Sequence, residues 1–200
     1  MKDLCVKLSG IGALLICIPV MWRISQGDVF NPASYFLWSL LSLVCVLVLL
    51  RDKKGGHTMM IGYVASDFLI GFYAYRKLGK ASFGSFEWLI VALTGVCVCI
   101  WLWCEHVARR DKKQDFKPSV ITNTVACMIA GIPQIIDSFK NPYQVSFVIC
   151  AFYMLVSGLA YYGEKPTLNG RLLPGVSIIY WIIMIVGLII ARSIAPTTTQ

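Results

Sequence analysis

Seven long apolar runs follow one another along the chain, each bounded by charged residues, proline or glycine. Each run is continuous rather than alternating, and each approaches the roughly 17–25 residues that a helix needs to cross a bilayer core. An open sheet in lipid would leave backbone groups unpaired, so the runs predict helices rather than strands. The predicted fold class is therefore an all-α bundle of seven transmembrane helices. The predicted helices cover residues 4–22, 34–50, 58–75, 86–104, 118–136, 143–162 and 172–191.

The composition agrees with this pattern. Hydrophobic residues make up 58% of the 200 positions and charged residues 14%, and the mean hydropathy is +0.71. A soluble domain cannot bury that much apolar surface, so we expect the bilayer to be the main solvent of the chain. Lys2 and Lys7 precede the first run, as in a secretory signal peptide. That run contains Pro19 and continues to Trp22 without a small-residue cleavage site, so we expect it to stay in the membrane as the first helix.

Lysine and arginine are distributed unevenly between alternate loops. Twelve of the 18 lie on the side of the N-terminus and six on the other side. The positive-inside rule therefore predicts a cytoplasmic N-terminus and, for an odd number of helices, a C-terminus outside. We expect a multi-pass protein of the plasma (inner) membrane with the lipid bilayer as a partner. The net charge of +8 reflects this topology rather than nucleic-acid binding, because the basic residues lie close to the helix ends.

The cysteines and histidines do not form a catalytic or metal-binding pattern. The eight cysteines fall inside or at the edges of apolar runs, where a thiol behaves as a small hydrophobic group. No CxxC or Cys/His ligand spacing is found, and His57 and His106 are isolated in loops. We therefore predict no cofactor and no metal. HExxH, GxSxG and paired-carboxylate arrangements are also missing from the sequence, so we do not expect an enzyme.

The chain contains an internal repeat. Residues 17–20 (Cys-Ile-Pro-Val) align with residues 131–134 (Gly-Ile-Pro-Gln), which places the first helix on the fifth. Each half then continues with a short polar link, a second helix, a charged loop and a third helix. The fourth helix is left over as a linker, so both triplets have the same orientation and should pack about an axis along the membrane normal. The predicted units are a first repeat at 1–80, a linker helix with a basic cytoplasmic loop at 81–117, and a second repeat at 118–200.

This plan of three helices, one helix and three helices resembles that of the PQ-loop and SWEET-type transporter superfamily. The segment 132–141, with Pro133 and Gln134 near the end of the repeat's first helix, is similar to the PQ-loop motif. The first repeat departs from it, with Pro19-Val20 at the corresponding place. The cytoplasmic N-terminus resembles the vitamin-type (nicotinamide riboside-like) branch, although residues 71–75 (Gly-Phe-Tyr-Ala-Tyr) replace that branch's tryptophan-rich motif. The resemblance implies a transporter.

Pro19 and Pro133 occupy equivalent positions in the two repeats. Proline removes a backbone hydrogen bond and clashes with the preceding turn, so a helix kinks or flexes there. Paired kinks predict hinges for alternating access. The alternative is that membrane helices simply tolerate proline.

Asp67 lies near the middle of the third predicted helix. A carboxylate at that depth costs about 2.5–3.5 kcal/mol on insertion scales and usually faces a water-filled path, a proton relay or a substrate. Tyr63 is four residues earlier and shares its helix face. On the seventh helix Ser177 and Tyr180 form a comparable stripe, and Tyr180 occupies the Asp67 position of the repeat. We therefore predict that these residues line a central path for substrate or protons, the alternative being structural hydrogen bonds between helices.

Two amide side chains on the fifth predicted helix and two tryptophan rings elsewhere are further candidates for contact with a solute. Asn123 and Gln134 are eleven residues apart and fall on nearly the same face of a straight helix, so we predict that both contact a polar solute. Interhelical hydrogen bonding is the alternative for either amide. Trp38 and Trp181 are predicted to provide apolar surface for a ring.

The function predicted first is a transporter, as a facilitator or a proton-coupled carrier, for a small polar metabolite such as a sugar, amino acid or vitamin. A seven-helix receptor or sensor of the same architecture is the alternative. The partner expected besides lipid is a small-molecule solute, and the sequence leaves substrate, direction and any homo-oligomer open.

Overall fold

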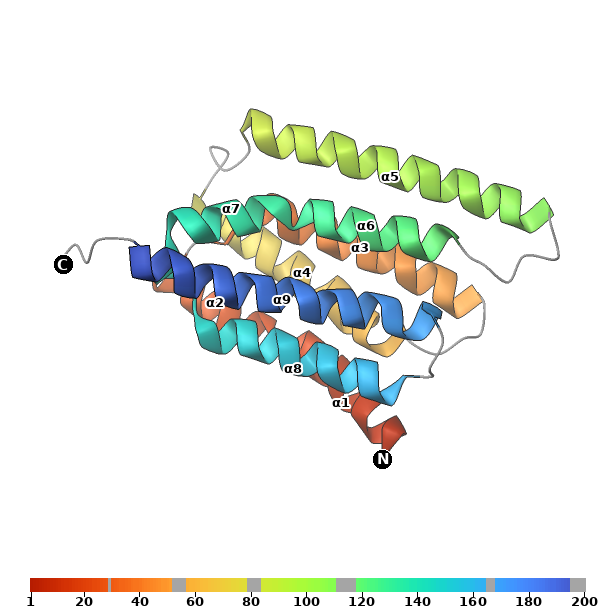
Figure 1. Cartoon of the computed structure of the whole chain (residues 1–200), viewed down its shortest axis with the longest axis horizontal. Coiled ribbons are helices and arrows are strands. Elements are labelled where there is room, and N and C mark those ends of the chain that lie inside the picture. The colour runs from red at the N-terminus through yellow and green to blue at the C-terminus, as the bar shows by residue number, and fades with distance from the viewer. Residues whose placement is uncertain (29, 52–56, 79–83, 111–117, 165–167, 195–200) are drawn as a thin grey trace.

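A computed structural model describes residues 1–28, 30–51, 57–78, 84–110, 118–164 and 168–194 (Figure 1). Over these ranges the chain is helical and contains no β-strand, so the predicted all-α class is confirmed. The helices lie side by side along one common direction (Figure 1). They are α1 (Lys2–Leu15), α2 (Cys17–Ser25), α3 (Pro32–Arg51), α4 (His57–Leu78), α5 (Ser85–Arg110), α6 (Pro118–Ala130), α7 (Ile132–Lys140), α8 (Phe147–Gly163) and α9 (Leu168–Ile194).

A helix occupies each of the seven predicted segments, and two of the segments contain a break. The first segment is divided at Ile16 into α1 and α2, and the fifth at Gly131 into α6 and α7. Pro19 and Pro133 follow these breaks by three and two residues. Each proline lacks the N–H that would bond the carbonyl four residues earlier, and its ring clashes with that carbonyl, so the break lies within the turn before it.

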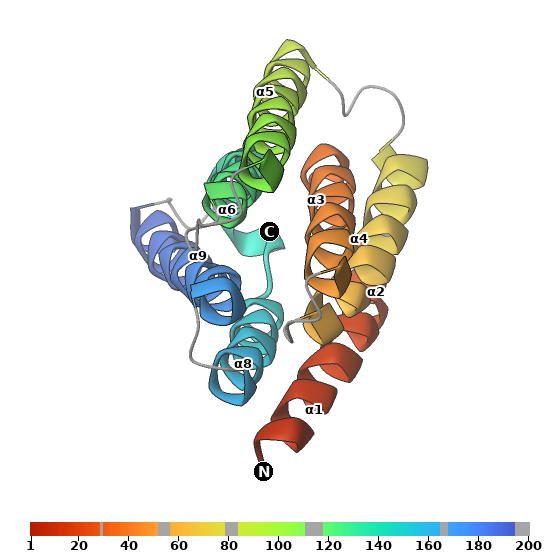
Figure 2. The same ribbon diagram turned by 90° about the vertical axis from the view of Figure 1, so that its right-hand side faces the viewer.

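The helices form two groups with α5 at the periphery (Figure 2). In the N-terminal group α4 packs against α1, α2 and α3, and in the C-terminal group α9 packs against α6, α7 and α8. The groups meet where α1 contacts α8 and where α3 contacts α6, and α5 packs chiefly on α6. The last helix of each group, α4 or α9, thus contacts the other helices of its group.

Apolar side chains cover much of the outside of this bundle. Val148, Trp103 and Ile189 are 77%, 70% and 56% exposed. Among the described residues, three helical stretches are long and apolar enough to cross a membrane, namely Lys2–Ser25, Ser85–Cys104 and Gly170–Ile194. The stretches Pro32–Leu47 and Phe147–Gly163 are apolar but shorter. The bundle therefore turns hydrophobic surface outward over several helices.

Polar groups, by contrast, are buried between the helices. Ser66 and Ser157 are fully covered, and the Ser157 hydroxyl lies 2.8 Å from that of Ser177, which joins α8 to α9. Gly62 brings α4 close to α1, since a Cβ there would lie 2.5 Å from the carbonyl oxygen of Gly10. Close backbone approach through small residues and hydrogen bonds across helices are typical of packing in membranes.

Arg192 fixes the connection between α7 and α8 onto the end of α9. This connection contains a 3₁₀ helix, η2 (Pro142–Gln144), so α8 begins at Phe147, four residues after the predicted start. The guanidinium donates hydrogen bonds to the carbonyl oxygens of Pro142 and Val145 at 2.9 and 2.7 Å, and lies 4.2 Å from the ring centre of Phe147. A charge-assisted pair of this kind is stronger than a hydrogen bond between neutral groups.

Candidate functional site

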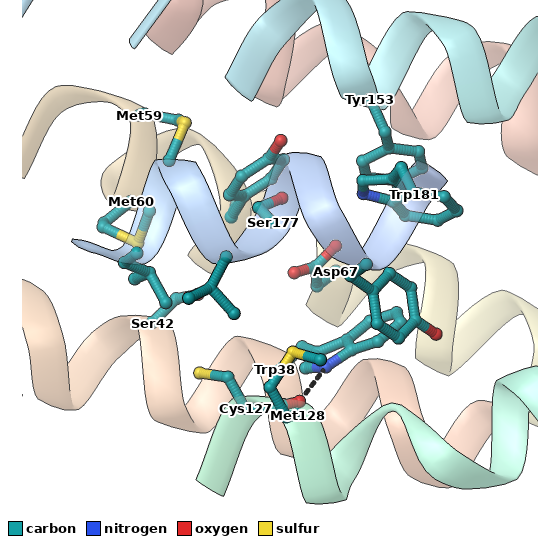
Figure 3. Close-up of a pocket in the computed structure, with 14 residues that line it drawn as sticks. Trp38, Ser42, Met59, Met60, Asp67, Cys127, Met128, Tyr153, Ser177 and Trp181 are labelled. Carbon is teal, nitrogen blue, oxygen red and sulfur yellow. Dashed lines mark hydrogen bonds between the residues drawn. The ribbon is translucent and has the colours of Figure 1, made fainter. Parts of the chain in front are cut away.

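A cavity of about 80 Å³ lies between the two helix groups (Figure 3). It extends from the middle of the bundle toward the end where α3 finishes and α4 and α9 begin. That free volume is enough for several water molecules or a small solute. The N-terminal group contributes Trp38, Ser42, Met59, Met60, Tyr63 and Asp67 to its lining, and the C-terminal group contributes Cys127, Met128, Tyr153, Leu173, Val176, Ser177, Tyr180 and Trp181.

Asp67 is the one acidic residue among the described residues that line the cavity. Asp67 is 4% exposed, and its Oδ1 atom has no hydrogen-bond partner among the described residues. Figure 3 shows the carboxyl group in the centre of the drawn residues, with Tyr153 and Trp181 to one side and Trp38 to the other. A buried polar atom without a partner costs about 1–3 kcal/mol, more when the group is charged, and calls for a ligand, water or ion.

Aromatic rings surround this carboxyl group on the walls of the cavity. Tyr153 of α8 stacks on Trp181 of α9, with ring centres 4.3 Å apart and an angle of 15°. Tyr63 of α4 also stacks with Tyr153, with ring centres 6.0 Å apart and an angle of 28°. Tyr180 meets Trp181 edge-on at 5.1 Å. Such pairs favour fixed geometries, so the rings form a defined aromatic wall across both helix groups.

Two of the cavity's aromatic residues also bond to the broken helix. The indole N–H of Trp38 donates to the carbonyl oxygen of Cys127 at 2.9 Å, and the Tyr180 hydroxyl donates to the carbonyl oxygen of Gly131 at 3.1 Å. A Cβ on Gly131 would lie 2.7 Å from the Tyr180 ring, so a glycine at the break permits this contact. These two hydrogen bonds connect the cavity wall to the α6–α7 break.

The structure brings together five of the seven residues predicted for the substrate or proton path. Asp67, Tyr63, Tyr180, Ser177 and Trp181 all line the cavity. Asp67 of α4 and Tyr180 of α9 line the same space.

The other two predicted residues, Asn123 and Gln134, are buried but do not line the cavity. The prediction that they share a face assumes an unbroken helix, whereas the break at Gly131 lies between them. Gln134 instead accepts a hydrogen bond from the backbone N–H of Asn31 at 2.7 Å and donates to the Ser138 hydroxyl at 3.1 Å. Its amide is thus part of an interhelical network, the alternative given for it above.

That network joins α3, α5 and α7 at the opposite end of the bundle from the mouth of the cavity. The Asn31 amide donates to Asp137 at 2.7 Å and to Glu87 at 3.4 Å, and its oxygen accepts from the backbone N–H of Ala33 and Ser34 at the start of α3. These contacts are not predictable from the sequence, because single polar residues near helix ends do not reveal their partners.

Sequence reasoning also missed part of the cavity wall. Tyr153 lies in an apolar run that contains three further tyrosines, and no signal separates it from them. Met59, Met60 and Met128 add flexible, polarizable surface, which adapts to irregular ligands. Methionine in an apolar run predicts only burial.

Comparison with known proteins identifies no relative. No family model matches the chain, and no curated protein or solved structure does so either. Within the described part of the chain, no three His, Cys, Asp or Glu side chains are grouped as metal ligands. The function is therefore inferred from the cavity itself.

Proposed function

We propose that this protein is an integral membrane carrier for a small polar solute, working as a facilitator or a proton-coupled transporter. The observation that supports this most is the cavity between the two helix groups, which contains Asp67, whose Oδ1 atom has no hydrogen-bond partner among the described residues. A carboxyl group of this kind takes up and releases protons and accepts hydrogen bonds from a solute. Intramembrane acidic residues typically mark substrate or proton pathways.

The distribution of side chains supports a membrane location. Large apolar residues face outward along α1, α5, α8 and α9, while serine, asparagine, glutamine and aspartate side chains are buried between helices. This is the arrangement expected when hydrocarbon replaces water around a bundle. With the basic residues counted above, we place the N-terminus in the cytoplasm and the C-terminus outside, so the cavity extends toward the cytoplasmic end.

The helix contacts support two parallel repeats. The first, second and third helices of one group correspond to α1–α2, α3 and α4, and those of the other to α6–α7, α8 and α9. Exchanging the groups turns the α1–α8 contact into a contact between α6 and α3, which is also present. A pseudo-two-fold axis along the membrane normal accounts for this, and we propose membership of the PQ-loop and SWEET-type superfamily on this basis.

We propose that the breaks at Ile16 and Gly131 are the hinges of alternating access. Pro19 and Pro133 prevent the two segments at each break from joining into one continuous helix. A hinge is a short element that absorbs a backbone change while rigid bodies rotate around it. Trp38 and Tyr180 connect the solute cavity to the second break through hydrogen bonds to its carbonyl oxygens. Solute binding at the rings then favours one hinge geometry over the other.

The test is uptake of radiolabelled sugars, amino acids and vitamins into proteoliposomes at two external pH values. We expect one compound to accumulate above the level of protein-free vesicles. The Asp67→Asn variant should lose this uptake or make it insensitive to pH. Asp3→Asn is the matched control, because Asp3 is an exposed carboxylate in the first turn of α1, away from the cavity.

Three other outcomes would change the conclusion. Saturable binding of a compound that no vesicle accumulates would favour the receptor alternative. Equal uptake by wild type and Asp67→Asn would show a carrier whose path avoids this cavity. A folded protein that neither binds nor moves any compound would contradict the proposal.

A further inference from the structure

The charge of the cavity wall is one-sided. Among the described residues that line the cavity, Asp67 is the one carboxylic acid, and none is a lysine, arginine or histidine. An ionised carboxylate taken out of water without a partner is strongly disfavoured. The cavity therefore favours an occupant that places a positive charge next to Asp67.

The groups that face Asp67 from the packed helices are neutral at physiological pH. They are thiols and phenols, whose ordinary pKa values lie above 8. They are Cys17 of α2, Tyr35 of α3, Tyr63 of α4, Cys127 of α6, Tyr153 of α8 and Tyr180 of α9. Helix α1 meets α4 at Gly62 through Gly10 and Ala13, and its titratable residues all lie at or before Lys7. None of these groups supplies a cation.

The aromatic rings suit the same kind of ligand. Trp38, Tyr63, Tyr153, Tyr180 and Trp181 line the cavity around the carboxyl group. The face of an aromatic ring carries negative charge density, and several faces around one site are the usual means of recognising an ammonium group with apolar substituents. An anion would meet the ionised carboxylate of Asp67 unfavourably.

We propose that the Asp67 cavity binds a small organic ammonium cation, and that this cation and a proton occupy Asp67 in turn. The inference rests on the proposed carrier function and names its substrate class. One carboxylate compensates one positive charge, so binding of the cation releases the proton to water and binding of the proton expels the cation. A carrier built this way exchanges an organic cation for a proton across the membrane.

The test is equilibrium binding to the purified full-length protein in detergent, which does not require transport. The probes are choline, its neutral carbon isostere 3,3-dimethylbutan-1-ol, and the anion 3,3-dimethylbutanoate, which differ mainly in charge. We expect choline to bind at least about tenfold more tightly than the isostere and the anion not to bind. As the pH falls, the Kd for choline should rise toward a limit of about tenfold per pH unit, the slope for one proton displaced.

The variants separate a charge role from a structural one. Asp67→Asn should remove both the preference for choline and the pH dependence, while Asp67→Glu should keep a pH-dependent preference. Circular dichroism and size-exclusion profiles check that each variant is folded.

Equal affinity for choline and its isostere, absence of choline binding, or choline affinity that is independent of pH would overturn the inference. Any of these results leaves the carrier function to be judged separately by the uptake panel. A neutral compound taken up through Asp67 would preserve that function and reject the cation.

Discussion

Adding one methyl group at the α6–α7 break tests whether the cavity wall is closely packed there. Gly131 has φ of −80° and ψ of −14°, so its backbone tolerates alanine. A Cβ at this position would lie 2.7 Å from Cε2 of Tyr180 and 2.9 Å from Cζ2 of Trp38. Both atoms belong to rigid rings held by hydrogen bonds, so the rings must shift to admit the methyl group.

The size of the effect follows from this overpacking. Forcing an extra methylene or methyl group into a well-packed interior costs about 1–3 kcal/mol. For a chain of this length each kcal/mol lowers Tm by about 2–4 °C, so Gly131→Ala should lower Tm by about 2–12 °C. Gly95 on α5 is the matched control, because a Cβ there meets nothing within 4 Å. Replacing it with alanine should raise helix stability by about 0.5–1 kcal/mol.

The assay is thermal unfolding followed by circular dichroism, with the three proteins in the same detergent at one heating rate. We expect Gly131→Ala to unfold below wild type and Gly95→Ala at or above it. Binding of a cavity ligand should also weaken in Gly131→Ala alone. A Gly131→Ala protein that is as stable as wild type and binds as tightly would refute the packing described around this break.

Three further substitutions test other contacts by the same unfolding assay. Trp38→Phe keeps a ring in the cavity but removes the donor to the Cys127 carbonyl, so it should lower stability by about 0.5–1.5 kcal/mol, and no change would mean that the bond is not formed. Asn31→Ala removes the cap of α3 and the bond to Asp137, which together should lower the free energy of unfolding by about 2–4 kcal/mol. A loss of stability under about 0.5 kcal/mol would contradict the Asn31 network. Arg192→Gln should cost about 1.5–3 kcal/mol through its charge-assisted bonds, and should speed proteolysis between α7 and α8.

The sequence predicts the positions of the helices well because one strong signal determines them. Continuous apolar runs of sufficient length predict helices, and a helix is found at each predicted segment. The ends are predicted less well for two physical reasons. Helix α5 continues to Arg110, six residues beyond the predicted end, because a helix need not stop where its side chains become polar. Helix α8 starts late because Pro142 begins a separate 3₁₀ turn.

The candidate site is predicted in part, because five of the seven residues predicted for the path line the cavity. Aligning the two halves places Tyr180 opposite Asp67, and both line the cavity. The same alignment does not predict where the Gln134 side chain points. The rotation of α7 relative to α6 at the break depends on the local packing around Gly131. Tyr153 and the Asn31 network depend on contacts between distant segments, and no local pattern encodes those contacts.

The central claim is that solute crosses the membrane by way of the Asp67 cavity in exchange for protons. The most direct measurement is accumulation of radiolabelled choline in proteoliposomes whose lumen is more acidic than the outside, for wild type, Asp67→Asn and Asp3→Asn. We expect accumulation by wild type and Asp3→Asn, collapse of that accumulation when the proton gradient is dissipated, and none by Asp67→Asn. Accumulation only when the outside is the acidic side, or equal accumulation by Asp67→Asn, would contradict it.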